Sequence, residues 1–135
     1  MKRRIFFGVS ATCAGLLYFQ LSSRAENVDS GRTLYLKYCS SCHGKDGRGE
    51  GPVSPSLKVK VPDLTTLKKN NKGVFPLSRV MSSVDGSQSV RAHGEPSMPI
   101  WGEVFKKELK EEKYRELTTL HETRTIAEYL ATLQR

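Results

Sequence analysis

Apolar side chains recur three or four residues apart in four parts of the chain after residue 25, the spacing that places them on one face of an α-helix. The first predicted helix runs to about Cys39, with Asp29 or Ser30 as its N-cap. Its apolar face consists of Leu34, Tyr35 and Tyr38. No segment alternates convincingly between apolar and polar residues, so the fold is predicted to be all-α, with about four helices.

The other three helices follow after long polar segments. Pro76 suits the first turn of the second helix and Gly86 its C-cap. Its apolar face consists of Leu77, Val80, Met81 and Val84. A third helix is predicted from Glu103, with Val104, Phe105 and Leu109 as its apolar residues. Thr118 or Thr119 would cap the last helix, whose apolar residues are Ile126, Tyr129, Leu130 and Leu133.

Two segments between these helices read as loops. Residues 44–62 contain four glycines and three prolines, a composition typical of loops, and residues 87–99 are mostly polar. A loop as long as 44–62 is expected in a small domain only where it wraps around something. The apolar content of 37% is also low once the first 25 residues are set aside. We therefore expect a bound apolar group to complete the core.

The first 25 residues have the parts of an export signal. Three basic residues precede residues 5–21, which carry no charge and are mostly apolar, and Ser23 and Ala25 suit cleavage before Glu26. A second interpretation keeps residues 5–21 as a membrane anchor, since 17 residues is at the lower limit for a span. Lipidation at Cys13 is disfavoured because Thr12 precedes it. Both favoured interpretations place a domain of residues 26–135 outside the cytoplasm.

The charge of the chain changes when the export segment is separated. The formal net charge is +8, but residues 1–25 hold four basic residues and no acidic residue, which leaves the remaining domain at +4. A charge of this size favours partners with acidic docking surfaces. It does not indicate nucleic-acid binding, because no basic stripe with interleaved aromatic residues is present.

The residues that carry chemistry are Cys39-Ser-Ser-Cys42-His43, the C-x-x-C-H pattern of covalent haem attachment. Two thiols separated by two residues reach the two vinyl groups of one haem, and the following imidazole reaches the iron. Chance would produce the pattern in this composition on the order of once in a thousand chains. Three alternatives stay open here, namely a structural disulfide, a zinc site that lacks a second ligand pair, and a thioredoxin-like redox pair.

From about Gly31 onward the sequence resembles the small bacterial mono-haem cytochromes c that carry the attachment motif near the N-terminus. The shared motifs are Gly31-x-x-Leu34-Tyr35, Cys39-x-x-Cys42-His43-Gly44, Asp46-Gly47-x-Gly49-x-Gly51-Pro52, Met98-Pro99-x-Trp101-Gly102 and Ala127-x-Tyr129-Leu130. The resemblance implies a small cytochrome c fold, with long loops wrapped around one covalently bound haem c. It further implies a methionine from a downstream loop as the sixth iron ligand.

Met98 is the predicted sixth ligand, because it lies in a loop between two prolines. Met81 is assigned to core packing on its predicted helix, and His93 is a rival ligand in the same loop as Met98. The family also uses a loop proline carbonyl as acceptor for the ligating imidazole, and Pro55 is preferred for that role here. Trp101 is either a hydrogen-bond donor to a haem propionate or a packing residue.

A haem iron with both axial positions filled has no open site for a substrate, so the expected function is electron transfer and not catalysis. The expected protein is a periplasmic carrier of a respiratory chain, soluble or anchored to the outer face of the inner membrane. Two alternatives are a cytochrome subunit of an oxidoreductase complex and a five-coordinate haem that binds gases or acts as an enzyme. The five-coordinate alternative requires that Met98 does not ligate the iron.

Overall fold

The computed structural model describes residues 26–87, 98–108 and 112–135. Residues 26–38 are helical, and the α-helices that follow are α2 (Ser40–His43), α3 (Leu67–Asn70), α4 (Leu77–Asp85), α5 (Trp101–Glu108) and α6 (Arg115–Thr132). Short 3-10 turns lie between them at η1 (Ser54–Ser56), η2 (Leu64–Thr66) and η4 (Glu112–Tyr114). The residues described contain no strand, and the predicted all-α fold class is confirmed.

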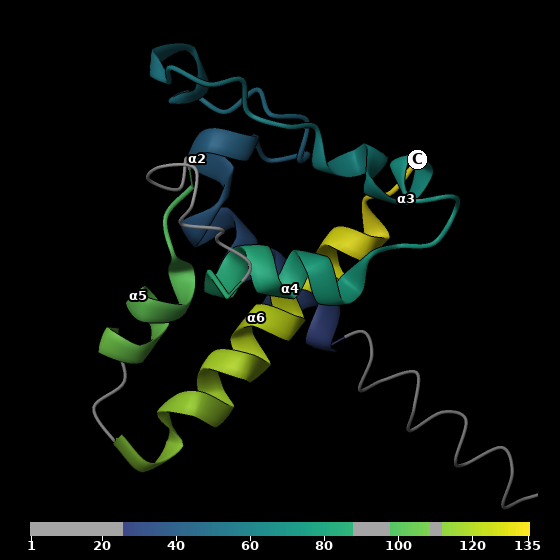
Figure 1. Cartoon of the computed structure of the whole chain (residues 1–135). Helices are drawn as coiled ribbons and strands as arrows, with labels where there is room; N and C mark the ends of the chain where they lie inside the picture. The colour runs from purple at the N-terminus through teal and green to yellow at the C-terminus, as the bar shows by residue number, and fades with distance from the viewer. Residues whose placement is uncertain (1–25, 88–97, 109–111) are drawn as a thin grey trace, which may run out of the picture.

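Helix α6 is the element on which α4, α5 and the first helix pack. Both α4 and α5 contact α6 and also contact each other (Figure 1). The helix of residues 26–38 approaches α6 closely at Gly31, where an added Cβ would lie 2.8 Å from the Cβ of Tyr129. The rings of Tyr35 and Tyr129 then meet at a centroid distance of 5.4 Å. The first helix and α6 are thus in direct contact through Gly31, Tyr35 and Tyr129.

The buried core lies where these helices meet. Its members come from the first helix, Cys39 directly after it, α4, α5 and α6, and are Tyr35, Tyr38, Cys39, Val80, Val84, Phe105, Ile126, Ala127, Tyr129 and Leu130. Burial of these apolar surfaces is the main stabilising contribution to the fold. Cys39 is part of this core, so the predicted attachment motif begins at the core and leads away from it along α2.

Helix α4 ends where predicted, whereas Pro76 is its N-cap and does not lie in its first turn. It begins directly after Pro76, and Gly86 follows it with a φ of 80°, the left-handed conformation that glycine adopts without strain. The predicted face is confirmed in part, because Val80 and Val84 are buried while Met81 is half-buried against the core.

Three predicted helix starts are wrong. Residues 26–30 are already helical, so Asp29 and Ser30 do not cap the first helix, and α5 begins two residues before Glu103. Helix α6 begins at Arg115, and Thr119 lies inside it with only 5% exposure. The last error has a physical reason, because Thr119 and Thr123 are buried on α6 with hydroxyls that find no partner among the described residues, although threonine is classed as polar in the sequence.

None of the helices formed by the described residues is long and apolar enough to cross a membrane. The predicted signal or anchor in residues 1–25, including its apolar part 5–21, lies outside those residues. So does His93, the rival iron ligand.

Candidate functional site

The two motif cysteines and the histidine are presented by a single helical turn. After the first helix ends, the backbone N–H groups of Cys42 and His43 both donate to the carbonyl of Cys39, at 3.2 and 2.9 Å. Cys39 is 6% exposed and His43 is 8% exposed, while Cys42 is half-buried. Both cysteines are free thiols, so the structure does not form the disulfide considered above.

The glycine-rich loop wraps back over this turn and satisfies its carbonyl groups. The N–H of Gly49 donates to the carbonyl of His43 at 2.8 Å, and that of Gly51 donates to Cys42 at 3.1 Å. Val53 continues the pattern by donating to Ser41 at 3.0 Å. A Cβ on Gly51 would lie 2.6 Å from the carbonyl carbon of Cys42, so only glycine allows this approach. The glycine-rich loop therefore wraps around the attachment motif itself.

Tyr35 fixes the other end of the turn. Its phenol donates a buried hydrogen bond of 2.6 Å to the carbonyl of Gly44, the residue that follows His43. Burial raises the pKa of Tyr35 well above its usual value, so the phenol keeps its proton and stays a donor. A residue of the first helix thereby holds the chain on the far side of the histidine.

His43 is a buried imidazole with an incomplete set of partners. Burial lowers its pKa, and the backbone carbonyl of Pro62 acts in the opposite sense. Among the described residues, Nδ1 of His43 finds no hydrogen-bond partner of ordinary geometry, so the contact with Pro62 is polar but not a formed hydrogen bond. A neutral, buried imidazole is suited to metal ligation, because its nitrogen lone pair is free of a proton.

The carbonyl that faces His43 is thus that of Pro62, and the prediction of Pro55 is corrected. Pro55 is exposed in η1, on a part of the chain that extends away from the helical body (Figure 1). The chain returns at Val61 and Pro62, where the Pro62 carbonyl oxygen would lie 3.2 Å from a Cβ on Gly49. The prediction of Pro55 rested on the resemblance of Pro55-Ser-Leu57 to the family's Pro-x-Leu pattern.

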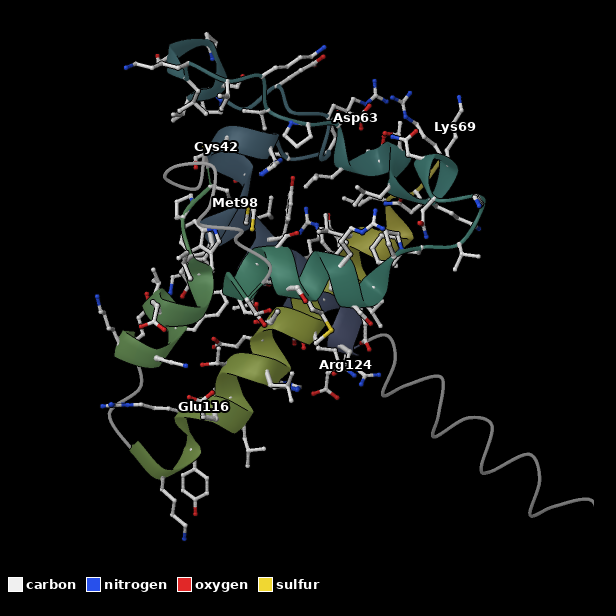
Figure 2. All side chains as sticks on the ribbon, in the orientation of Figure 1. Cys42, Asp63, Lys69, Met98, Glu116 and Arg124 are labelled. Atoms are coloured by element: carbon white, nitrogen blue, oxygen red, sulfur yellow. The ribbon has the colours of Figure 1, made fainter. Side chains whose placement is uncertain are left out.

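Two adjoining cavities open beside the motif, with volumes of about 520 and 350 Å³. Five residues line both of them, namely Cys39, His43, Pro62, Ser83 and Met98. Cys42 lines the larger one, and Figure 2 shows Cys42 and Met98 in the same part of the molecule. Met81 lines neither cavity. The structure therefore brings the predicted ligand pair His43 and Met98 to one site.

An aromatic pair forms one wall of the larger cavity. Trp101 and Tyr38 both line it, with ring centroids 5.3 Å apart, and Phe105 lies 5.1 Å from Tyr38. Packing against Tyr38 is thus an observed role of Trp101. The Tyr38 phenol reaches the surface, where it donates a 2.6 Å hydrogen bond to Glu108. Tyr38 was not predicted as a site residue, although its position directly before Cys39 was a usable signal.

The chemistry of the lining fits a large apolar group attached through sulfur. Burial, together with the nearby Cys42, raises the pKa of Cys39 to about 12, so its thiol is neutral. Two free thiols, a buried imidazole and a thioether face cavities whose size is typical of ligand sites, about 300–1,000 Å³. Within the described ranges, no group of three or more His, Cys, Asp or Glu side chains could hold a metal ion by itself.

The chain was also compared with known proteins. Residues 26–119 match the protein family described as cytochrome C oxidase, cbb3-type, subunit III. The match covers the attachment motif, the glycine-rich loop, Met98 and the first turn of α6. No curated protein and no solved structure matches the chain.

Proposed function

The chain belongs to the family of cytochrome c oxidase, cbb3-type, subunit III, and from this premise we propose that it is a single-haem electron-transfer protein with His43 and Met98 as axial ligands. Membership of the family implies covalently bound haem c and electron transfer through it. Cys39 and Cys42 are the residues that would carry the two thioether bonds. When bound, haem c supplies one-electron chemistry by cycling between Fe(III) and Fe(II).

The observation that carries this proposal is the set of residues shared by the two cavities. Cys39, His43 and Met98 line both, although they come from segments more than fifty residues apart in the sequence. A histidine and a methionine on one cavity, beside two free thiols, match the donor set of a low-spin haem c. A methionine placed only for packing would not need to share both cavities with the imidazole.

The protein's own residues would hold the ligands still and limit access of water. The Gly49 and Gly51 N–H groups and the Tyr35 phenol fix the backbone around His43, so the imidazole needs little rearrangement when the iron changes charge. Trp101 and Tyr38 give the cavity an apolar wall. A thioether ligand favours Fe(II) and raises the potential relative to a second imidazole.

We further propose that the domain works outside the cytoplasm, in the periplasm, either soluble or anchored through residues 5–21. The basis for this is the export-like sequence of residues 1–25. Partners with acidic docking surfaces are supported by Lys58 and Lys60, which are exposed beside the larger cavity, and Lys60 lines it. The nearby apolar side chains Val53 and Val59 are 42% and 47% exposed and suit a transient contact.

A second candidate function is favoured by the family itself, whose description is that of an oxidase subunit. In that case the haem would serve one fixed complex. Gentle solubilisation of membranes and affinity purification of the full chain would separate the two candidates. A stoichiometric oxidase complex supports the subunit, whereas recovery of the chain alone, with reversible reduction by several small acidic redox proteins, supports the mobile carrier.

Absorption spectroscopy of Met98→Ala and Met81→Ala tests the ligand set. Met98→Ala should keep covalent haem but lose the ferric methionine–iron charge-transfer band, lower the potential and bind CO readily when reduced. Met81→Ala is the matched control and should retain the band. If Met81→Ala loses the band instead, the ligand assignment is wrong, and ready CO binding by the unmodified protein would favour the five-coordinate alternative.

Covalent attachment is tested separately with Cys42→Ser, which should sharply reduce the yield of haem-stained protein on a denaturing gel. A Ser41→Ala variant is the control, because Ser41 is exposed between the two cysteines and its side chain forms no thioether. An unchanged yield in Cys42→Ser would contradict attachment at both sulfurs.

A further inference from the structure

Gln134 and Arg135 bind residues 63–68, a segment distant from them in the sequence. Arg135 pairs with Asp63 through Nη2 and Oδ2 at 2.7 Å, and its Nε donates to the Thr65 hydroxyl at 2.7 Å. The backbone N–H of Arg135 also donates to the Thr65 carbonyl at 3.1 Å. A single residue thus contacts the backbone, the hydroxyl and the carboxylate of the turn at η2.

Gln134 binds the same segment with both ends of its amide. Its Nε2 donates to the carbonyl of Leu64 at 2.9 Å, and its Oε1 accepts from the N–H of Lys68 at 2.9 Å. Nε2 also donates to Leu130 at 2.8 Å, a core residue of the last turn of α6. Residues 63–68 are therefore fastened to the core through α6. We call Gln134 and Arg135 together the α6 clamp.

The segment held by the α6 clamp begins directly after Pro62. Asp63 closes the turn by accepting from the Thr65 N–H at 2.9 Å and from the Thr65 hydroxyl at 2.6 Å, and Leu64 donates to Gly47 at 2.7 Å. On the other side, Gly49 donates to the His43 carbonyl and packs against the carbonyl of Pro62. The position of the Pro62 carbonyl thus depends on bonds that run to residues 134 and 135.

We infer that Gln134 and Arg135 are positioning residues for the haem. The α6 clamp fixes the chain that follows Pro62, a residue that lines both cavities together with His43. The Pro62 carbonyl would accept a hydrogen bond from Nδ1 of His43, which has no partner among the described residues, once the imidazole ligates the iron. The inference rests on the proposed function, in which His43 ligates the iron. An acceptor on the second nitrogen makes a ligating imidazole more basic, which favours Fe(III) and lowers the reduction potential. Loosening the α6 clamp should therefore raise the potential.

The sign of the shift separates this role from simple electrostatics. Removing the positive charge of Arg135 would by itself disfavour the more negative Fe(II) state and lower the potential. Loss of the Pro62 acceptor acts in the opposite direction. Gln134→Ala changes no charge, so any shift in that variant comes from position alone.

The experiment compares Arg135→Ala and Gln134→Ala with the unmodified full chain carrying haem. At a fixed mediator potential, each variant should raise the ratio of Fe(II) to Fe(III) by about threefold. This is less than the change expected when the hydrogen-bond partner of a metal ligand is removed altogether. Proton NMR of the reduced protein should show faster solvent exchange of the His43 ring N–H in both variants. Arg135→Lys keeps a cation beside Asp63 and should recover part of the shift.

The matched control is Arg124→Ala. Arg124 forms a comparable ion pair with Glu128 at 2.8 Å within α6, far from Asp63 (Figure 2). The inference is overturned if the Fe(II) to Fe(III) ratios of Gln134→Ala and Arg135→Ala do not exceed that of Arg124→Ala and the exchange of the His43 ring N–H is unchanged. That result would leave the proposed function standing. Absence of bound haem or of a reversible couple in the unmodified chain overturns the proposed function and the inference with it.

Discussion

The two sides of the candidate haem site are built in different ways. The His43 side is fixed by main-chain hydrogen bonds, in which Gly49 and Gly51 cap the carbonyl groups of His43 and Cys42. Tyr35 adds a buried hydrogen bond to the backbone of Gly44. Because backbone groups make most of these bonds, the side chains of the loop matter chiefly where they would obstruct the approach.

The Met98 side is fixed by the shapes of side chains. Ile100 lies against the left-handed Gly86, where an added Cβ would come within 2.9 Å of Ile100 Cγ1, and Gly102 lies against the backbone of Asp85. Trp101 packs on Tyr38. Both sides thus use glycines for close approach. We conclude that the attachment side is fixed mainly by main-chain hydrogen bonds, whereas the Met98 side is fixed mainly by the packing of large side chains.

The largest effect is expected from placing a side chain in the attachment loop. Gly51→Ala would drive a methyl group into the backbone of Ser41 and Cys42, at a cost of about 3 kcal/mol in the free energy of unfolding. The yield of haem-attached protein should fall with it, because the turn that presents both thiols is displaced. Chemical denaturation and haem staining measure the two consequences.

Gly73→Ala is the control for this variant. Gly73 has no atom within 4 Å of an added Cβ, but its φ is 81°, so alanine there suffers only backbone strain of about 1–2 kcal/mol. Gly73→Ala should leave haem attachment unchanged. Equal losses in both variants would mean that the loop is not closely packed on the motif.

A smaller effect is expected when an aromatic side chain is removed from the Met98 side. Trp101→Ala should cost about 2 kcal/mol, less than a fully buried tryptophan, because Trp101 is half-buried. Haem attachment should be normal, but the ferric methionine–iron band should weaken because the segment that carries Met98 loses its contact with Tyr38. Absorption spectra and haem staining separate these outcomes.

Tyr114→Ala is a matched change for Trp101→Ala, since Tyr114 is 49% exposed in η4 and does not line either cavity beside the motif. It should leave the band at full strength. A Trp101→Ala variant with an intact band, or one that fails to attach haem, would remove the distinction between the two sides.

The same distinction explains what the sequence could and could not predict. The attachment motif was predictable because its chemistry lies in five consecutive residues, from Cys39 to His43. Met98 was preferred over Met81 because one lies in a loop and the other on a helix face, and only Met98 reaches the cavities. Both inferences used local patterns, which a single sequence contains.

Pro62 was not predictable in the same way. Three prolines lie in residues 44–62, and the one that faces His43 is decided by bonds between distant segments, such as those of Gln134 to Leu64 and Lys68. The start of α6 was missed because Thr119 is buried, and a residue type does not reveal whether its methyl group or its hydroxyl group decides its position. Long-range pairing and the orientation of threonine are properties of the folded chain.

The smallest effect concerns the turn that follows Pro62, and it is read from pH dependence. Hydrogen bonds from the Thr65 hydroxyl and N–H, then the Arg135 side chain, lower the pKa of Asp63 from 3.8 to about 2. Between these two values the unfolded chain binds more protons at this carboxyl than the folded chain does, so this contribution to stability is present above pH 3.8 and is lost as the pH falls toward 2. Asp63→Asn should therefore lose less stability than the unmodified protein when urea unfolding at pH 5 is compared with unfolding at pH 3.

The order of the causes makes this prediction sharper. Thr65→Val removes the hydroxyl, the largest contribution, at a buried position where valine has nearly the same shape, while Arg135→Ala removes a smaller one. The loss of stability between pH 5 and pH 3 should then be smallest in Asp63→Asn, larger in Thr65→Val and larger again in Arg135→Ala. If Arg135→Ala flattens the pH dependence more than Thr65→Val, the ion pair dominates at this turn. The His43 side would then depend on a charged side chain as well as on main-chain hydrogen bonds. The two sides of the site would differ less than we conclude above.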